Sequence, residues 1–319
     1  MYLGFALVKN LRSSASELIF SDFTLRNIQQ GDIDVLRRAQ ELFPGGHASY
    51  GDWIYERSYD TIADDQWERI SVDTENILLL LRLYRVGDLV FLQPCTQEPG
   101  GRFLHQLPYR VMSYIPPTHR FEMGSDECSL FDEFAADIIS LENWSSTWFQ
   151  ITRRFFLLGS STEFNPRLTY FDRVVDYMIS LEATLVPDRG FVGSRLSERA
   201  ASLLTVLDMD RDDTKRILKK FYDIRSKVAH GADTIRLIDA ALENADVFEK
   251  IVRMTIVEAL RKTPADNACR KTFLKELYEV PDSKRTETIY KVFCDIKDQG
   301  EKNKCFAQLS KRIAEARSV

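Results

Sequence analysis

The chain has 319 residues, of which 44% are hydrophobic and 29% are charged, a balance that is ordinary for a globular protein. Such a composition excludes a collagen-like or largely disordered chain, and the length allows two domains of about 150 residues each. Residues 1–150 carry 12 Lys and Arg against 22 Asp and Glu, whereas residues 151–319 carry 31 against 26. The acidic part would repel a phosphate backbone and the basic part would tolerate one. A plain difference in surface composition between two domains explains the same asymmetry.

Cysteine usage and the N-terminus favour a reducing compartment. The cysteines are odd in number and scattered, and no two of them have C-x-x-C spacing: Cys95, Cys128, Cys269, Cys294 and Cys305. Neither a disulfide framework nor a structural zinc site is therefore expected. The first apolar stretch has no basic region before it, which favours a strand over a signal peptide. The longest aliphatic run, Ile77–Leu81, is far shorter than the roughly 20 residues of a membrane helix, so we expect a soluble, cytoplasmic protein.

The N-terminal part combines short apolar runs with turn signals. Two helices are expected among them, one after Asp32 with its apolar face over residues 35–42, and one after Asp73 that carries residues 77–83. Strands are expected where four apolar runs lie between Gly- and Pro-containing turns: Phe5–Val8, Leu18–Phe20, Leu89–Leu92 and Tyr109–Met112. This pattern predicts an α+β domain over residues 1–128.

From about residue 129 onward the apolar residues recur at helical spacing. Leu130, Phe134, Ile138 and Leu141 begin this pattern, and a long apolar stripe then follows Pro166 and ends at Pro187. Trp144 and Trp148 lie one helical turn apart, where packing between the domains is favoured over base stacking. Further helices are expected at 194–208, 212–230, 234–262, 267–279, 284–297 and 302–316. The fold class is therefore mainly α, with an all-α bundle over 129–262 and a C-terminal helical extension over 263–319 that packs on the bundle or binds a partner.

One helix end carries residue types suited to chemistry on a phosphate. Arg225 lies at the edge of the apolar stripe of the helix at 212–230, and His230 is its last residue before Gly231. A helix C-terminus favours the imidazolium form of a histidine, and imidazole can both accept and donate a proton near neutral pH. An arginine can hold a phosphate by paired hydrogen bonds and offset its developing charge. Together they suffice for attack of a ribose 2′-hydroxyl on the adjacent phosphate without a metal.

The spacing also carries a geometric problem. Five residues at about 100° each place Arg225 and His230 roughly 140° apart around an ideal helix. The two side chains converge only if the last turn unwinds at Gly231, or if a second copy of the chain completes the site. On spacing alone, R-x-x-x-x-H is common by chance, and a capping histidine beside a surface arginine explains it equally well.

The surrounding residues add a resemblance. Residues 221–231 read F-Y-D-I-R-S-K-V-A-H-G, which resembles the Y-x-x-R-S-K-I-A-H-G signature of the ApeA-like HEPN family. Two upstream segments resemble the same family in the same order. Residues 171–185 look like its first long helix with the L-E-A-L end, and residues 194–204 look like its R-A-A-x-L-L helix. The resemblance covers residues 166–261, about a third of the chain.

The resemblance implies a helical bundle of four or five helices that dimerises, and a role in bacterial anti-phage defence or toxin systems through RNA cleavage. It implies Arg225 and His230 as the catalytic pair, with Ser226 as the polar residue after the arginine. For Glu182 two roles stay open, orienting Arg225 across the bundle or acting as a solvated carboxylate at a helix end. Asp223 and Tyr222 are candidates for the rim of the site, although Tyr222 also suits packing.

The resemblance departs from the family at one position. HEPN toxins that are silenced by adenylylation have a tyrosine two positions after the histidine, where this chain has Ala232, so control by that modification is not expected. No phosphate loop of the G-x-x-x-x-G-K-[ST] type occurs, and the four histidines lack the spacing of metal ligands. We therefore expect neither a cofactor nor a metal.

The sequence favours a HEPN endoribonuclease whose N-terminal domain senses a trigger or restrains activity. RNA is then the substrate, a second copy of the chain is the expected partner, and a protein or phage trigger would act through the N-terminal domain or the C-terminal helices. The alternative is a non-catalytic HEPN module for dimerisation or for binding RNA, nucleotide or protein. A nucleotide-binding regulator is a third reading, because Arg225 would serve any phosphate.

Overall fold

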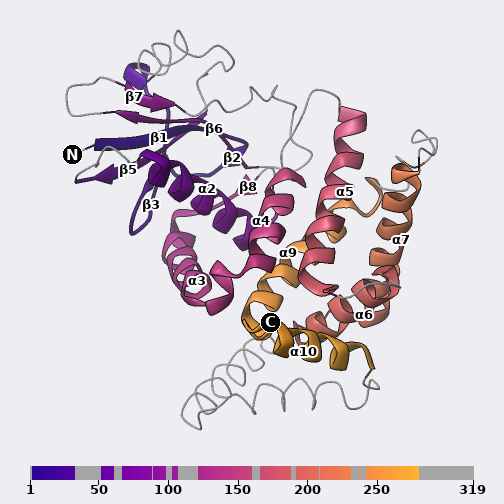
Figure 1. The fold of residues 1–319 in the computed structure, drawn as a ribbon. Helices are drawn as coiled ribbons and strands as arrows, with labels where there is room; N and C mark the ends of the chain where they lie inside the picture. The colour runs from indigo at the N-terminus through magenta and orange to yellow at the C-terminus, as the bar shows by residue number, and fades with distance from the viewer. Residues whose placement is uncertain are drawn as a thin grey trace. The chain divides into compact units, whose positions relative to one another are not determined.

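The chain divides into two compact units in the computed structural model (Figure 1). The first unit comprises Met1–Ile139 and Ser160–Tyr170, and the second comprises Ser140–Gly159 and Phe171–Val319. The residues that the structure describes are 2–32, 52–60, 67–87, 89–97, 103–106, 121–159, 166–187, 192–207, 209–230, 237 and 242–279. Within these ranges the chain is mainly helical and its strands lie in the N-terminal part, which confirms the predicted fold class at that level.

An antiparallel sheet forms the centre of the first unit. The strand order is β3-β4-β5-β1-β6-β7, and a separate parallel pair joins β2 to β8. The central strand β1 is buried through Phe5–Val8, as its unbroken apolar run predicts. The strands are β1 (Tyr2–Lys9), β2 (Leu11–Arg12), β3 (Glu17–Ile19), β4 (Thr24–Asn27), β5 (Trp53–Tyr59), β6 (Val90–Gln97), β7 (Phe103–Gln106) and β8 (Phe121–Glu122).

Helices α2 and α3 accompany the sheet in the described part of the first unit. Helix α2 (Trp67–Tyr84) lies against β1, because a Cβ on Gly4 would come within 3.1 Å of Ile70. Helix α3 (Cys128–Ser140) follows the short η1 turn (Ser125–Glu127). The ring of Phe131 in α3 packs edge-on against Phe20 at 5.2 Å and against Tyr84 at 5.6 Å. These ring contacts explain why α3 belongs to the first unit, although the predicted boundary at residue 128 assigned it to the bundle.

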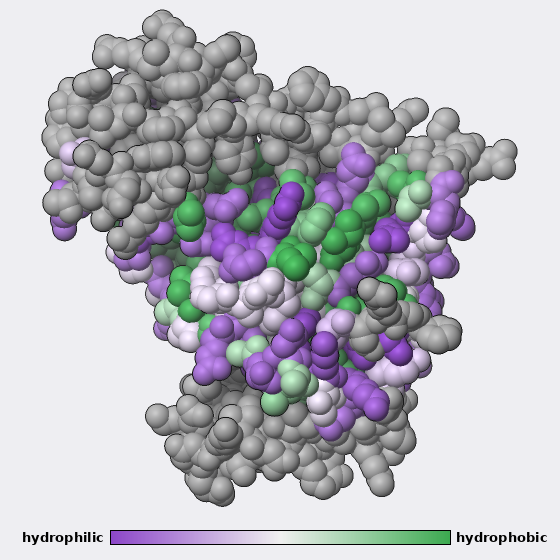
Figure 2. Space-filling view, viewed as in Figure 1, coloured by the Kyte–Doolittle hydropathy of each residue, from purple (hydrophilic) through white to green (hydrophobic). Residues whose placement is uncertain are grey.

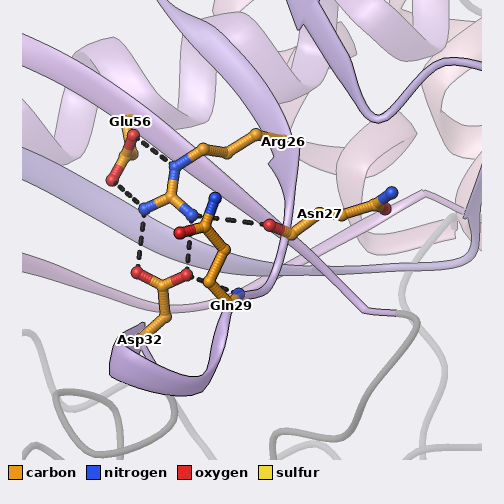
Figure 3. A network of polar contacts seen from close by, with 5 residues as sticks. All are labelled: Arg26, Asn27, Gln29, Asp32 and Glu56. Carbon is orange, nitrogen blue, oxygen red and sulfur yellow. Dashed lines mark hydrogen bonds and ion pairs between the residues drawn. The ribbon is translucent and has the colours of Figure 1, made fainter.

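A polar network ties β4 to β5 at one end of the sheet (Figure 3). Arg26 donates two hydrogen bonds to Glu56 and two to Asp32, at 2.6 to 2.9 Å, and Asp32 also accepts from the main-chain N–H of Gln29. Burial alone would raise the pKa of Asp32, but the hydrogen bonds from Arg26 and Gln29 outweigh it and lower that pKa. By donating two hydrogen bonds to each carboxylate, Arg26 holds β4 against β5 and fixes the turn that follows β4.

The predicted strands of the N-terminal part have mixed outcomes. Phe5–Val8, Leu18–Phe20 and Leu89–Leu92 correspond to β1, β3 and β6, whereas Tyr109–Met112 and the helix at residues 35–42 lie outside the described residues. Helix α2 begins at Trp67, six residues before the predicted start at Asp73. The strands β2, β4, β5, β7 and β8 were not predicted. In β4 and β5 polar residues interrupt the apolar pattern because Arg26 and Glu56 pair across the strands.

The second unit contains helices throughout its described residues. Their bounds are η2 (Glu142–Ser145), α4 (Thr147–Gly159), α5 (Pro166–Leu185), α6 (Val192–Leu204), η3 (Thr205–Leu207), α7 (Arg211–Ala229), α9 (Ala245–Lys262) and α10 (Asn267–Glu279), with α5 entering the unit at Phe171. Phe221 of α7 stacks on Phe248 of α9 at 3.8 Å, and Tyr177 of α5 meets Phe248 edge-on. These rings join three helices in one core.

Buried cations hold the C-terminal end of α5. Arg199 of α6 donates to the carbonyl of Leu185, and Arg270 of α10 donates to those of Ala183 and Thr184. Burial and the nearby charge of Arg199 lower the pKa of Arg270 to about 10, so Arg270 stays charged at neutral pH. Helix α10 therefore packs into the second unit, which is one of the two roles that the sequence left open for the residues after 263.

Both tryptophans pack against residues of the second unit. Trp148 is 8% exposed and donates to Asn143, and the guanidinium of Arg270 lies 4.7 Å above its ring. Trp144 packs against Phe149 at 5.2 Å. The printed partners of both rings belong to the second unit, and the expectation that these rings join the two domains stays a prediction.

Helix bounds were predicted well where Pro, Gly or Asp marks an end. The expected helices at 194–208, 212–230 and 267–279 correspond to α6 with η3, α7 and α10. The single helix expected at 234–262 is wrong, because Glu243 and Asn244 form a turn and α9 begins at Ala245. In α3 the buried side chains are Cys128, Phe131 and Ile138, so the predicted stripe is right at Ile138 and wrong at Leu130, which is 54% exposed. The helices expected at 284–297 and 302–316 lie outside the described residues.

Candidate functional site

Helix α7 presents the residues that the sequence singled out. It begins at an N-cap, where the side chain of Asp210 accepts from the N–H of Asp213, and it buries a continuous face against its neighbours. That face consists of Thr214, Ile217, Leu218, Phe221 and Ile224. The opposite face is charged, with Arg216 paired to Asp213 and Lys220 paired to Glu243. In Figure 2 hydrophilic side chains dominate the surface over α7, while hydrophobic ones gather over α4 and α5.

The helix keeps its hydrogen bonding to its last turn. Ala229 is the last helical residue, and His230 is the C-cap with φ −96° and ψ 11°. The main-chain N–H of His230 donates to the carbonyl of Ser226 at 3.1 Å. The side chain of His230 is exposed to solvent. Through His230 the last turn of α7 is therefore wound, and Gly231, the point at which unwinding was considered, lies outside the described residues.

Arg225 faces Glu182 of α5 across the bundle. The Nη2 atom of Arg225 lies 3.5 Å from Oε1 of Glu182, and the two side chains are 29% and 24% exposed. The buried Nε of Arg225 and the buried Oε1 of Glu182 have no hydrogen-bond partner in the part of the chain that the structure describes. This geometry is a loose ion pair rather than a two-pronged lock. Of the two roles left open for Glu182, it supports orientation of Arg225.

The electrostatics of the pair depend on burial. Desolvation raises the pKa of Glu182, and the positive charge of Arg225 lowers it again in part, so that the net direction is upward. The guanidinium thus favours the charged form of the carboxylate. Among the described residues the guanidinium makes no hydrogen bond, so its five donors can serve another partner.

The supporting residues occupy different positions. The ring of Tyr222 packs on Gly193 in the first turn of α6, where a Cβ would come within 2.6 Å of it, so Tyr222 is a packing residue. Asp223 lies on the exposed face of α7, and Ser226 is half-buried and accepts the hydrogen bond of the C-cap through its carbonyl. The structure therefore brings Glu182 to Arg225 and gives Asp223 no contact with that pair. Gly193 was missed in the sequence, where a glycine early in a helix is its only signal.

The described residues contain neither a cluster of metal-ligating side chains nor a membrane-spanning helix. Across the described ranges no group of three or more His, Cys, Asp or Glu side chains could hold a metal ion. No helix among the residues described above is long and apolar enough to cross a membrane.

The chain was compared with protein-family models, with curated proteins and with solved structures. None of the three comparisons finds a match. The arguments for function therefore come from the residues and their geometry.

Proposed function

We propose that this protein is a metal-independent endoribonuclease of the HEPN type, in which Arg225 and His230 carry the reaction. The observation that supports the proposal best is the state of Arg225. Its guanidinium is half-buried, lies 3.5 Å from Glu182 and makes no hydrogen bond among the described residues, on the same helix that ends at the exposed His230. A half-buried guanidinium whose donors are not taken up by the described residues suits a phosphate group.

The proposed reaction needs no nucleophile from the protein. The ribose 2′-oxygen attacks the adjacent phosphorus, the bond from phosphorus to the 5′-oxygen breaks, and a 2′,3′-cyclic phosphate forms. Arg225 binds the nonbridging oxygens and offsets the charge that develops on them. His230 accepts the proton of the 2′-hydroxyl and becomes an imidazolium. In that form it donates a proton to the departing 5′-oxygen.

A second copy of the chain completes the proposed site. Because α7 is regular through Ala229, Arg225 and His230 point about 140° apart around one helix. Two copies that pack through their helical units would bring the Arg225 of one copy toward the His230 of the other. We therefore propose a homodimer as the active form.

The proposed biological setting is bacterial defence against phage, in the cytoplasm, where cleavage of RNA halts growth. Within that setting the strand-containing first unit senses a trigger or restrains activity. The separation of the chain into two compact units supports a division of labour of this kind.

The experiment that tests the proposal is incubation of the purified protein with total RNA, with His230→Ala beside the wild type. A positioned acid–base group contributes about 10²- to 10⁴-fold, so the variant should retain little cleavage. Its unfolding midpoint should match the wild type, because the imidazole is exposed and the cap is made by the main chain. Cleavage by His230→Ala at the wild-type rate would show that the assigned site is wrong.

A further inference from the structure

The carboxylate of Glu182 depends on a single cation. In the described part of the chain, the charged group that faces it is Arg225 of α7, at 3.5 Å. Two other cations lie near the end of α5, Arg199 of α6 and Arg270 of α10. Both donate to main-chain carbonyls of residues 183–185 and not to the carboxylate. Among the described residues, Arg225 is therefore the cation that favours the charged form of Glu182.

A phosphate on Arg225 changes this balance. In the free site the charges of Glu182 and Arg225 cancel. A phosphate monoanion bound to Arg225 adds one negative charge to a half-buried place, next to a carboxylate whose Oε1 is already buried without a hydrogen-bond partner. Two anions sharing one cation in such surroundings raise the pKa of the weaker acid, because each disfavours the charged form of the other.

We propose that a phosphate group bound by Arg225 displaces Glu182, and that Glu182 then takes up a proton from solvent, so that RNA binding is coupled to proton uptake. The inference rests on the proposed function, in which Arg225 holds the scissile phosphate. The balance is simple: the carboxylate becomes a carboxylic acid, and the site is neutral both before and after binding. Glu182 is thus a positioning residue in the free protein and a built-in competitor of the substrate phosphate.

The coupling has a definite sign. Proton uptake occurs in the pH window between the lower pKa of Glu182 in the free protein and its higher pKa in the complex. Affinity for RNA therefore rises as the pH falls through that window. Above the window Glu182 stays charged in both states and competes with the phosphate for Arg225.

Isothermal titration calorimetry of the full chain tests the inference. The probe is a short RNA oligonucleotide that is 2′-O-methylated at every position, which removes the attacking hydroxyl. Titrations in two buffers of different ionisation enthalpy, from about pH 5 to pH 8, give the number of protons taken up. All proteins carry His230→Gln, which removes the imidazole as a second proton acceptor.

The expected result is uptake that approaches about one proton per bound oligonucleotide toward the acidic end, and that disappears in Glu182→Gln. At neutral pH Glu182→Gln should also bind roughly twofold to fivefold tighter, because the competing charge is gone. Glu182→Asp keeps a carboxylate and should keep the uptake. Asp223→Asn is the matched control: it removes the same charge from the exposed face of α7 and should leave the proton count unchanged.

Two failures are distinguishable. In the first, Arg225→Gln binds weakly, which shows that binding requires Arg225, but Glu182→Gln takes up as many protons as its parent. The coupling is then wrong and the proposed function stands. If the oligonucleotide does not bind, or binds Arg225→Gln equally well, the phosphate site and the coupling both fail. Should Glu182→Gln not fold, the parent protein still decides: an affinity that is constant from pH 8 to pH 5 overturns the inference.

Discussion

Replacing Arg225 by alanine separates a functional arginine from the structural ones in the same bundle. The expected loss of stability is small, because the side chain is 29% exposed and its contact with Glu182 is a 3.5 Å ion pair without a hydrogen bond. Pairs of this kind contribute at most about 1 kcal/mol. For a unit of this size that corresponds to a shift of about 2–4 °C in the unfolding midpoint. The expected loss of RNA cleavage is about 10²- to 10³-fold, as for removal of one preorganised donor to a developing oxyanion.

Arg173 is the matched control for this prediction. It is 6% exposed, donates to the carbonyl of Gly159 at 2.9 Å, and lies 3.3 Å from Glu249. Its removal takes away a buried hydrogen bond to the carbonyl of Gly159 and an ion pair with Glu249, which costs roughly 3 kcal/mol or more. Arg173→Ala should therefore lower the unfolding midpoint clearly, while the fraction that remains folded should still cut RNA.

The assay pairs a thermal melt with cleavage of a labelled RNA at a temperature where each variant is folded. Arg225→Lys belongs in the same series and should rescue poorly, because an ammonium lacks the planar fork that binds two phosphate oxygens. The reasoning is refuted if Arg225→Ala cuts at the wild-type rate, or if it melts as early as Arg173→Ala. The second result would make Arg225 one more structural arginine.

Three more outcomes follow from the same structure. Cleavage should persist in excess chelator and leave a cyclic phosphate on the 5′ fragment, and a substrate with one 2′-deoxy nucleotide at the cut site should survive; cutting there would mean that water is the nucleophile. Light scattering should give a homodimer, and a strict monomer that still cuts RNA would refute the shared site. Since the pKa of Asp32 is lowered, the stability it gains from Arg26 is present above the unfolded-state pKa near 3.8 and is lost as the pH falls below it. Asp32→Asn should therefore lower the midpoint of urea unfolding at neutral pH and converge with the wild type in acid, and equal midpoints at pH 7 would contradict this.

The ends of the helices could be predicted largely from proline and capping residues in the sequence. Pro166, Pro187 and Asp210 lie at or next to helix ends because proline and capping side chains act locally, within one turn of where they occur in the sequence. The helix predicted at 234–262 continued wrongly through Glu243 and Asn244, where neither proline nor glycine marks the break. Asn244 is the N-cap of α9, a position that asparagine favours, but its side chain makes no capping hydrogen bond.

The sheet could be predicted less well, because its polar residues are satisfied by partners far along the chain. Arg26 and Glu56 lie 30 positions apart and still form two hydrogen bonds across neighbouring strands. In the sequence each of them only interrupts an apolar pattern, and the strands β4 and β5 were missed for that reason. Strands such as β1, whose residues are buried on both faces, have no such interruption and were recognised.

The candidate site shows the same division between local and distant information. The sequence places Arg225 and His230 at one helix end. It does not distinguish Arg225 from Arg199 and Arg270 as a ligand-binding residue. The fold distinguishes them: Arg199 and Arg270 each donate to main-chain carbonyls at the end of α5, whereas among the described residues the side chain of Arg225 makes no hydrogen bond and has the 3.5 Å ion pair with Glu182. An arginine that holds main-chain carbonyls contributes to the fold, and one without such hydrogen bonds can donate them to a ligand. By that criterion Arg225 is the arginine of this helical unit to test first for phosphate binding.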